Sequence, residues 1–361
     1  MTPSAVGYAR VRDDRRPPID ARLRSASRPA VLVLAALCAA APATAAIAEG
    51  SRVTTFDLQG HRGARGLRPE NTLAGFVFAL ELGVSTLELD CAVTRDGIVV
   101  VSHDPVLNPD YTRDERRRFI DAAGPSIATL SYAELRRYDV GRLRPGTGYA
   151  ARFPDQQAVD GERIPRLGEV FALVRSRGDA EVRFNVETKV SPDRPDLTAT
   201  PEAFAKAVVD AVRDAGMESR TTIQSFDWRT LSIVRRIAPE IATVALTDQQ
   251  PGDDTIQAGR PGPSPWLGGL DVDDFGGSVP KLVHASGARV WSPNYLDLDS
   301  RLVGEARALG LAVVPWTVNE PPEMKRVLDL GVDGMISDRP DRLRSEIEAR
   351  GIPWRSGAPA R

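Results

Sequence analysis

The 361-residue sequence predicts an α/β fold, a closed (β/α)₈ (TIM) barrel, and two observations lead to this prediction. Short apolar segments alternate with helical patterns almost to the end of the chain, which is typical of parallel strands that are buried on both faces. Polar residues follow several of these segments directly, at the carboxyl ends where a barrel builds its functional site. A doubly wound open sheet is the competing architecture, and the polar strand ends favour closure.

Eight strands are expected, each short and apolar. Their predicted ranges are Phe56–Gly60, Thr86–Asp90, Val182–Glu187, Thr221–Ser225, Thr243–Thr247, Val290–Ser292, Ala312–Trp316 and Gly334–Ser337. Helical patterns separate them, and one of these opens at Pro201 and ends at Gly216, the usual asymmetry of helix ends. The polar residues at strand ends are His61, Asp90, Glu187, Gln224 and Trp316.

Two stretches interrupt the alternation. Residues 91–163 contain a ninth strand-like run, IVVVSHD, and then a polar segment rich in arginine, proline and glycine. We expect them to form a small inserted subdomain after the second strand. Residues 248–280 are predicted to form a long irregular loop, and loops of this length are often functional.

The first 45 residues predict a secretion signal. Arg22, Arg24 and Arg28 precede the apolar run AVLVLAALCAA, and APATAA follows, with cleavage expected near Ala45. The run is shorter than the ~20 residues of a spanning helix, so no stable membrane span is expected in the mature form; an N-terminal anchor is the alternative. We therefore expect an exported protein, periplasmic or secreted, with residues 46–361 as its barrel domain.

Charge and cysteine content narrow the possible partners. Removing seven of 47 basic and three of 49 acidic residues with the signal leaves 40 against 46, a net charge near −6. This balance argues against nucleic acid as a partner. Cys91 is the one cysteine left after cleavage, so an internal disulfide is excluded.

The end of the second strand gathers acidic side chains. Glu88 and Asp90 are two residues apart on a strand, so their side chains point to the same face. Two carboxylates on one face of a buried strand are costly unless something cationic neutralises them. The Asp96–Gly97 pair is a strong signal for a two-residue hairpin turn, which places Asp90 opposite His103 on the returning arm. Cys91 points to the opposite face and is expected to be a buried hydrophobe.

A third carboxylate is expected from the next strand of the barrel. Glu187 and Lys189 are again two residues apart. Carboxylates from two strands form an all-oxygen site for one divalent cation, Ca²⁺ or Mg²⁺, rather than for zinc. Lys189 and Arg62 would crowd such a site unless an anion lay between them, and phosphate fits that description.

These pieces together resemble a known family. The motifs HRG…PENT, ELD…T.DG..V..HD, E.K and W.VN resemble those of the glycerophosphodiester phosphodiesterase family, in the phosphatidylinositol phospholipase C-like phosphodiesterase superfamily, over essentially the whole mature chain. The resemblance implies a barrel with a small insertion after the second strand. It also implies a divalent cation, a small-molecule glycerophosphodiester substrate, and hydrolysis to glycerol 3-phosphate and an alcohol.

The resemblance also implies roles for particular residues. The matching positions are His61 and His103 for acid/base catalysis, Glu88, Asp90 and Glu187 for metal ligation, Arg62 and Lys189 for phosphate contact, and Trp316 for the aromatic residue at the mouth. By the resemblance His61 is the base and His103 the acid; direct attack by water and a cyclic phosphate intermediate both stay open. The sequence departs from the family after Asp104, which leaves the head-group preference open.

Supporting roles are expected for two further polar residues, Gln224 and Glu70. Gln224 stands at a strand end, and Glu70 is expected to reach the metal or to pair with Arg62 or Arg65, with a supporting role favoured. Asn71 is a candidate cap for the helix that follows it.

Other functions explain fewer of these residues. A glycosidase using paired carboxylates leaves both histidines unexplained. A non-catalytic phosphodiester-binding protein and a related barrel phospholipase acting on intact phospholipid are the remaining alternatives. His284 is expected to be structural, and Trp266 and Trp291 are expected to pack in the core.

Overall fold

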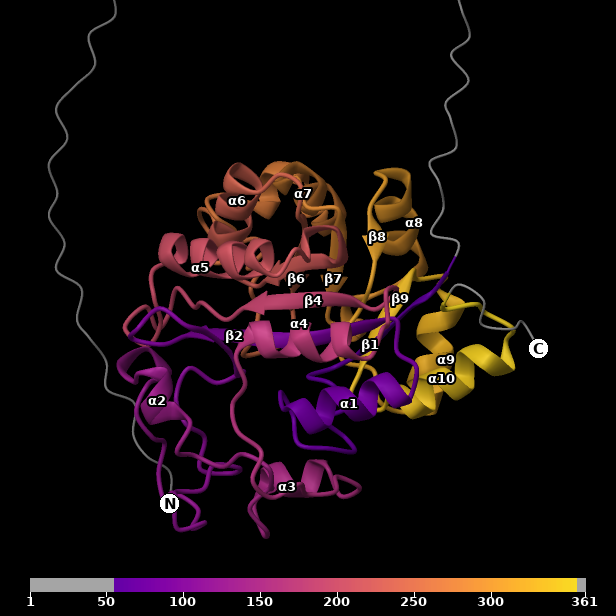
Figure 1. The fold of residues 1–361 in the computed structure, drawn as a ribbon. Coiled ribbons are helices and arrows are strands. Elements are labelled where there is room, and N and C mark those ends of the chain that lie inside the picture. Colours follow the sequence, from indigo (N-terminus) through magenta and orange to yellow (C-terminus); the bar gives the residue numbers. More distant parts are fainter. Residues whose placement is uncertain (1–54, 356–361) are drawn as a thin grey trace, which may run out of the picture. The chain divides into compact units, whose positions relative to one another are not determined.

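The predicted strands form a parallel barrel in the computed structural model, which describes residues 55–355 (Figure 1). The predicted secretion signal, residues 1–45, lies outside the described residues. The strands are β1 (Asp57–Gly60), β2 (Thr86–Val93), β3 (Val99–Val101), β4 (Arg183–Thr188), β5 (Thr221–Ser225), β6 (Ala242–Thr247), β7 (Val290–Pro293), β8 (Ala312–Val313) and β9 (Gly334–Ser337). Eight of them are hydrogen-bonded in the order β8-β7-β6-β5-β4-β2-β1-β9, all parallel, and β3 pairs with β2 in antiparallel fashion.

The barrel is nearly closed between β8 and β9. Backbone N–H groups of Asp333 and Ile336 donate to the carbonyls of Val313 and Pro315, both at 2.9 Å, and that of Val318 donates to Ile336 at 3.0 Å. The strand predicted at 312–316 shortens to Ala312–Val313, since Pro315 has no N–H for a ladder bond. The barrel prediction is confirmed, and the open sheet is wrong.

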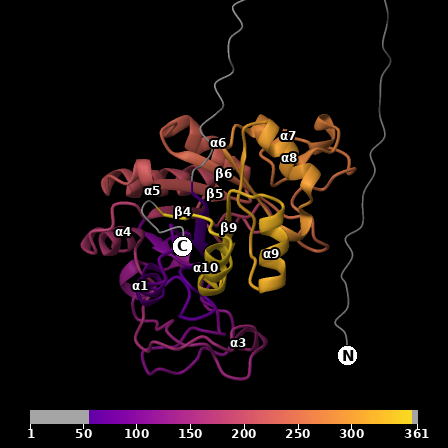
Figure 2. The ribbon, with the colours of Figure 1, turned by 90° about the vertical axis from the view of Figure 1, so that its right-hand side faces the viewer.

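Helices surround the strands (Figures 1 and 2). They are α1 (Leu73–Glu81), α4 (Leu167–Ser176), α5 (Pro201–Asp214), α6 (Trp228–Ile237), α7 (Val279–Ser286), α8 (Ser300–Ala308), α9 (Pro321–Asp329) and α10 (Pro340–Ala349). Helix α5 shows why these segments are helical. The Thr200 hydroxyl caps it by accepting from Ala203 N–H, Pro201 opens it, and Phe204, Val208 and Val212 form one buried face.

The β2–β3 hairpin differs from its prediction by one residue. Cys91 pairs with Val101, and the N–H of Thr94 donates to the carbonyl of Ile98 at 3.0 Å, so three residues form the loop. The third of them, Gly97, has φ +79°, the left-handed conformation that a three-residue hairpin loop requires.

This longer loop moves the partner of Asp90. The N–H of Ser102 donates to the carbonyl of Asp90 at 2.9 Å, so Ser102 lies opposite Asp90. The predicted pairing of Asp90 with His103 is therefore wrong. His103 follows one residue further along the returning arm.

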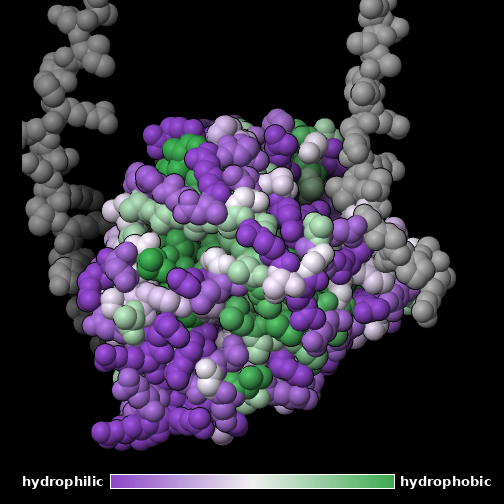
Figure 3. Space-filling model, viewed as in Figure 1, coloured by the Kyte–Doolittle hydropathy of each residue, from purple (hydrophilic) through white to green (hydrophobic). Residues whose placement is uncertain are grey.

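The segment between β3 and α4 has its own hydrophobic cluster. It contains α2 (Tyr132–Leu135), α3 (Gly148–Arg152) and a 3₁₀ turn (Ile127–Thr129), and Leu107, Ile127, Leu135 and Val140 are buried within the cluster. On the face shown in Figure 3, hydrophilic side chains gather at the lower left, where this segment lies. The segment belongs to the same compact unit as the barrel, so its standing as a separate subdomain stays a prediction. Within residues 55–355, no helix is long and apolar enough to cross a bilayer.

Candidate active site

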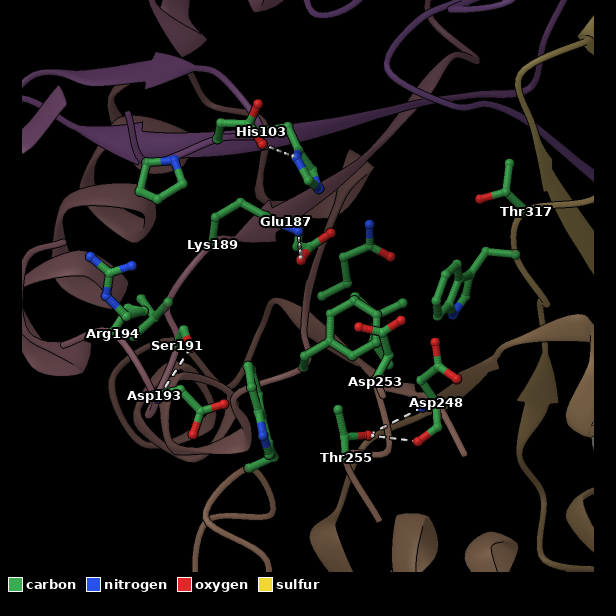
Figure 4. A pocket seen from close by; sticks show the side chains of 18 of the residues that line it. His103, Glu187, Lys189, Ser191, Asp193, Arg194, Asp248, Asp253, Thr255 and Thr317 are labelled. Atoms are coloured by element: carbon green, nitrogen blue, oxygen red, sulfur yellow. Dashed lines mark hydrogen bonds and ion pairs between the residues drawn. The ribbon is translucent and has the colours of Figure 1, made fainter. Parts of the chain in front are cut away.

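A cavity of about 830 Å³ lies at the carboxyl ends of the strands (Figure 4). Its lining includes most of the residues predicted for the site, namely His61, Arg62, Glu88, His103, Glu187, Lys189, Gln224 and Trp316. The loop predicted at 248–280 forms one wall, and Figure 4 shows Asp248, Asp253 and Thr255 of this loop together on one side of the cavity. Parallel strands end at the same rim, which is why residues far apart in the sequence meet here.

Three buried carboxylates converge at the base of the cavity. Strands β2 and β4 pair with Asp90 beside Glu187, and the period of two places Glu88 on the same face as Asp90. One carboxylate oxygen of each residue lies within 4.8 Å of the others. Glu88 and Asp90 are each 1% exposed and Glu187 is 6% exposed. The predicted convergence of acidic groups from two strands is therefore present.

Two cations flank these carboxylates. Arg62 Nε lies 3.3 Å from Asp90 Oδ2, and Lys189 Nζ lies 2.8 Å from Glu187 Oε1. Burial raises the pKa of Glu187 to about 7 although Lys189 opposes the shift. Burial, with the charges of Asp90 and Glu187, raises the pKa of Glu88 well above its usual range. For Asp90 burial is outweighed by Arg62, His103 and Lys189, and its pKa lies well below its usual range.

One fully buried oxygen of the cluster has no hydrogen-bond partner among the described residues. Asp90 Oδ1 is buried and unpaired, with Lys189 Nζ 3.9 Å away. A buried carboxylate oxygen without a partner is costly, and three acidic groups this close repel one another. A hard divalent cation with oxygen ligands would relieve both costs, so the donor set fits such an ion.

His61 is held by a carboxylate from the last strand. Its Nδ1 lies 2.6 Å from Oδ1 of Asp338, which follows β9, and its Nε2 lies 3.9 Å from Glu88 Oε2. Arg65 Nε and Asn319 Nδ2 donate to the same carboxylate, each at 2.8 Å. Burial, together with Arg65, lowers the pKa of His61 to about 4. At neutral pH its Nδ1–H donates to Asp338, which leaves Nε2 as an acceptor.

His103 is held in the same way by its neighbour. Its Nδ1 lies 2.8 Å from Asp104 Oδ1, and its side chain is 29% exposed to the cavity. Burial, with the charges of Arg62 and Lys189, lowers the pKa of His103 to about 4. The Nε2 of each imidazole is therefore an acceptor at neutral pH, and that of His61 accepts from Arg62 Nε at 3.4 Å.

Comparison with known proteins identifies the family. The model of the glycerophosphoryl diester phosphodiesterase family matches residues 61–342. The chain belongs to the glycerophosphoryl diester phosphodiesterase family. It is accordingly an enzyme of that class, and the family predicted from the sequence motifs is confirmed.

Individual relatives cover most of the chain. A glycerophosphodiester phosphodiesterase of Caldanaerobacter subterraneus subsp. tengcongensis is 28% identical over 291 residues, 81% of this chain and 97% of the relative. A solved structure from Silicibacter pomeroyi that bears the family's name is 38% identical with a TM-score of 0.75, covering 84% and 96%. A phosphodiesterase of Oleispira antarctica, solved with the product sn-glycerol-3-phosphate, is 22% identical with a TM-score of 0.58, covering 80% and 95%.

Two residues of the PENT motif, Glu70 and Asn71, form hydrogen bonds that hold Arg62 and Asp90 in position. Glu70 Oε1 accepts from Arg62 Nη1 at 2.8 Å, so Glu70 pairs with Arg62. Asn71 does not cap α1, because Thr72 does so by accepting from Gly75 N–H. Asn71 has φ +54°, and its Nδ2 donates to Asp90 Oδ2 at 2.9 Å.

Gln224 and the aromatic residues occupy different parts of the site. Gln224 Nε2 donates to Glu88 Oε1 at 2.7 Å. Trp316 lines the cavity and meets the ring of Phe226 edge-on, with 5.3 Å between centroids. Trp291 is buried in the core as predicted, but the same prediction for Trp266 is wrong, because Trp266 lines the cavity.

Sequence reasoning missed the acidic residues behind the histidines. Asp338 directly follows the last predicted strand, so the rule that selected His61 could have selected it. Asp104 stands beside His103 in the sequence, which is also a usable signal. The role of Arg65 could not be predicted from the sequence, because its contact with Asp338 depends on the pairing of β9 with β1.

Proposed function

We propose that the protein hydrolyses glycerophosphodiesters to glycerol 3-phosphate and an alcohol, with His61 and His103 as the acid/base pair and one divalent cation as cofactor. The observation that carries this proposal is the pairing of two imidazoles, each fixed through Nδ1 by a carboxylate, with three converging carboxylates. The product complex of the Oleispira relative supports the substrate class.

The cation would be held by the three buried carboxylates. Glu88, Asp90 and Glu187 offer only oxygen ligands, which suit Ca²⁺ and Mg²⁺. When bound, such an ion polarises a non-bridging phosphate oxygen and stabilises the charge of the transition state. Arg62 and Lys189 flank the same cluster and would bind the phosphate oxygens beside it.

The histidines would move the protons. His61 Nε2 accepts the proton of the attacking hydroxyl, and Asp338 stabilises the imidazolium that forms. His103 gives a proton to the departing alkoxide oxygen. The negative phosphate of a bound substrate would raise the pKa of His103 from its low value and so favour the protonated acid.

The rim of the cavity suits a polar, water-soluble diester. Exposed charged side chains border it from three separate segments, namely Arg152, Arg194, Asp253 and Arg260. Glycerophosphodiesters carry a charged phosphate and hydroxyl groups that such a rim solvates. Trp316 would lie against the apolar faces of the substrate at the mouth.

The test assays a panel of glycerophosphodiesters and intact phospholipids with EDTA and with each cation added back. We expect turnover of the glycerophosphodiesters that EDTA abolishes and Ca²⁺ or Mg²⁺ restores. His61→Ala and His103→Ala should each lose roughly 10²–10⁴-fold in kcat. His284→Ala, an exposed position on α7, is the matched control and should retain full activity. Wild-type turnover in both active-site variants would remove the mechanism.

Export is a separate part of the proposal. The order of basic, apolar and small residues in the first 45 positions supports cleavage near Ala45 and a periplasmic or secreted enzyme. Amino-terminal sequencing of the protein recovered from the producing cells tests this. A mature chain that begins near Ala46 supports export, and an intact Met1 in the cytoplasmic fraction contradicts it.

A further inference from the structure

Three aromatic side chains of the segment between β3 and α4 pack behind the active site. The rings of Tyr111 and Tyr149 have centroids 5.7 Å apart, and those of Tyr149 and Phe153 are 5.3 Å apart. Tyr111 and Phe153 are buried, and Tyr149 is half-buried. We call Tyr111, Tyr149 and Phe153 the aromatic row. Each member contacts an ionic group that in turn holds a residue of the site.

Tyr111 reaches His103 through a carboxylate. The Tyr111 hydroxyl donates to Asp104 Oδ2 at 3.0 Å, and Asn108 Nδ2 donates to the same oxygen at 2.6 Å. The other oxygen, Oδ1, accepts from His103 Nδ1. The two donors from this segment therefore fix the plane of the carboxylate that orients the imidazole.

Tyr149 reaches Arg62 through a second carboxylate. Its hydroxyl, at the start of α3, donates to Glu70 Oε2, while Glu70 Oε1 accepts from Arg62 Nη1. Arg62 lies in turn 3.3 Å from Asp90. Removing the tyrosine hydroxyl would leave a buried carboxylate oxygen without this donor and free Glu70 to rotate away from Arg62.

Phe153 reaches the site through a cation. The guanidinium of Arg65 stacks over the Phe153 ring, with 4.7 Å from Cζ to the centroid. Arg65 Nε and Nη2 donate to the two oxygens of Asp338 at 2.8 and 3.0 Å, and Asp338 holds His61. The members of the aromatic row thus contact, each through one charged neighbour or more, both histidines and Arg62.

We propose that Tyr111 and Tyr149 are positioning residues, through which the inserted segment orients His103 and Arg62 for catalysis. The inference rests on the proposed function, because it takes His103 as the acid and Arg62 as a phosphate contact. The two tyrosines act on different partners, so they should affect different kinetic constants. Tyr111 acts on proton transfer and hence on kcat, whereas Tyr149 acts on phosphate binding and hence on KM.

The test replaces each hydroxyl and keeps the ring. Tyr111→Phe should lower kcat roughly three- to tenfold with KM within about twofold of wild type, because a hydrogen bond to a charged group is lost while Asn108 still holds Asp104. Tyr149→Phe should raise KM roughly three- to tenfold with a smaller change in kcat. The assay uses the cation-loaded enzyme and glycerophosphocholine as substrate, with thermal unfolding measured on every variant.

Tyr132→Phe is the matched control. Tyr132 belongs to the same segment, packs against its hydrophobic cluster, and donates to a carboxylate, Glu169 Oε2, at 2.9 Å, but Glu169 contacts no residue of the site. Loss of the Tyr132 hydroxyl should change the thermal stability about as much as the other two substitutions do, and should leave kcat and KM unchanged. A general loosening of the segment would instead lower the activity of all three variants.

A double-mutant cycle separates positioning from folding. Tyr111→Phe should have less than about a twofold effect in an Asp104→Ala background, since its route to His103 is already cut. A full effect in that background would overturn the inference, as would wild-type kcat for Tyr111→Phe together with wild-type KM for Tyr149→Phe. The His103→Ala variant distinguishes failure of this inference from failure of the proposed function. If His103→Ala retains wild-type turnover, the proposed mechanism fails first, and the inference fails with it.

Discussion

At the scale of single residues, the orientation of His61 depends on Asp338. The carboxylate accepts from His61 Nδ1 at 2.6 Å and is itself held by Arg65 and Asn319. Asp338→Asn would still fill the space but could not stabilise the imidazolium. We expect kcat to fall roughly tenfold to a hundredfold, part of the ~10²–10⁴-fold that general base catalysis supplies.

Steady-state kinetics with the wild-type enzyme and the Asp338→Asn variant at one pH measure this loss. Asp341→Asn is the control, because Asp341 is three residues away and pairs with an arginine, Arg339, without contacting His61. It should retain wild-type kcat. An equal loss in both variants would mean that the substitutions disturb α10 rather than the histidine.

Some residues of the site were predictable because a local rule fixes their direction. Glu88 and Asp90 share a face because strand side chains alternate, and that rule needs no tertiary structure. The contact of Asn71 with Asp90 depends on a left-handed backbone conformation at φ +54°. Sequence patterns rarely predict this conformation for an asparagine. Asp338 meets His61 only because β9 pairs with β1 across the barrel.

At the scale of elements, the three-residue loop of the β2–β3 hairpin sets the path of the chain to His103. Gly97 holds φ +79°, and no atom of residues 55–355 lies within 4 Å of the position that a Cβ would take. Gly97→Ala therefore costs backbone strain without a clash, and we expect the free energy of unfolding to fall by about 1 kcal/mol. Urea denaturation of the purified protein measures the change.

Gly304→Ala is the matched substitution for this test. Gly304 is an exposed residue inside α8 with an ordinary helical backbone. In the described part of the chain, no atom lies within 4 Å of its Cβ position either. Alanine should raise the free energy of unfolding there by up to ~1 kcal/mol through helix propensity. Shifts of the same sign for the two variants would contradict this account.

The elements themselves were largely predictable, and the errors have local causes. Seven of the eight barrel strands lie within a few residues of their predicted ranges, because each is an apolar run with clear boundaries. The eighth is cut short at Val313, since Pro315 interrupts the ladder. The hairpin register was missed because Asp-Gly is common in two-residue turns, whereas here Gly97 occupies the third position of a longer loop.

At the scale of the whole molecule, the barrel gathers buried ionisable groups whose effects on stability oppose one another. Glu187 has its pKa raised by burial from 4.5 to about 7, so between these pH values the folded state keeps a proton that the unfolded state has lost. Stability falls as pH rises through this window. His61 and His103 have pKa values lowered by burial from 6.5 to about 4, so the unfolded state binds more protons there and stability rises with pH.

The contribution of Glu187 can be isolated by comparing Glu187→Gln with the wild type in EDTA. Glutamine cannot ionise, so the variant should gain stability relative to the wild type as pH rises from about 4.5 to about 7, and the difference should then level off. Ca²⁺ or Mg²⁺ should stabilise the wild type by about 2.7 kcal/mol at a hundred times Kd, and the variant much less, because an ion bound by the folded state alone shifts the unfolding equilibrium.

Glu348→Gln, which changes an exposed glutamate paired with Arg344, should leave both the pH profile and the cation effect as in the wild type. Chemical denaturation across this pH range gives all three curves. A difference between Glu187→Gln and the wild type that does not change with pH would contradict the raised pKa of Glu187. Equal stabilisation of both proteins by the cation would mean that the carboxylates at the ends of β2 and β4 do not act together on one ion.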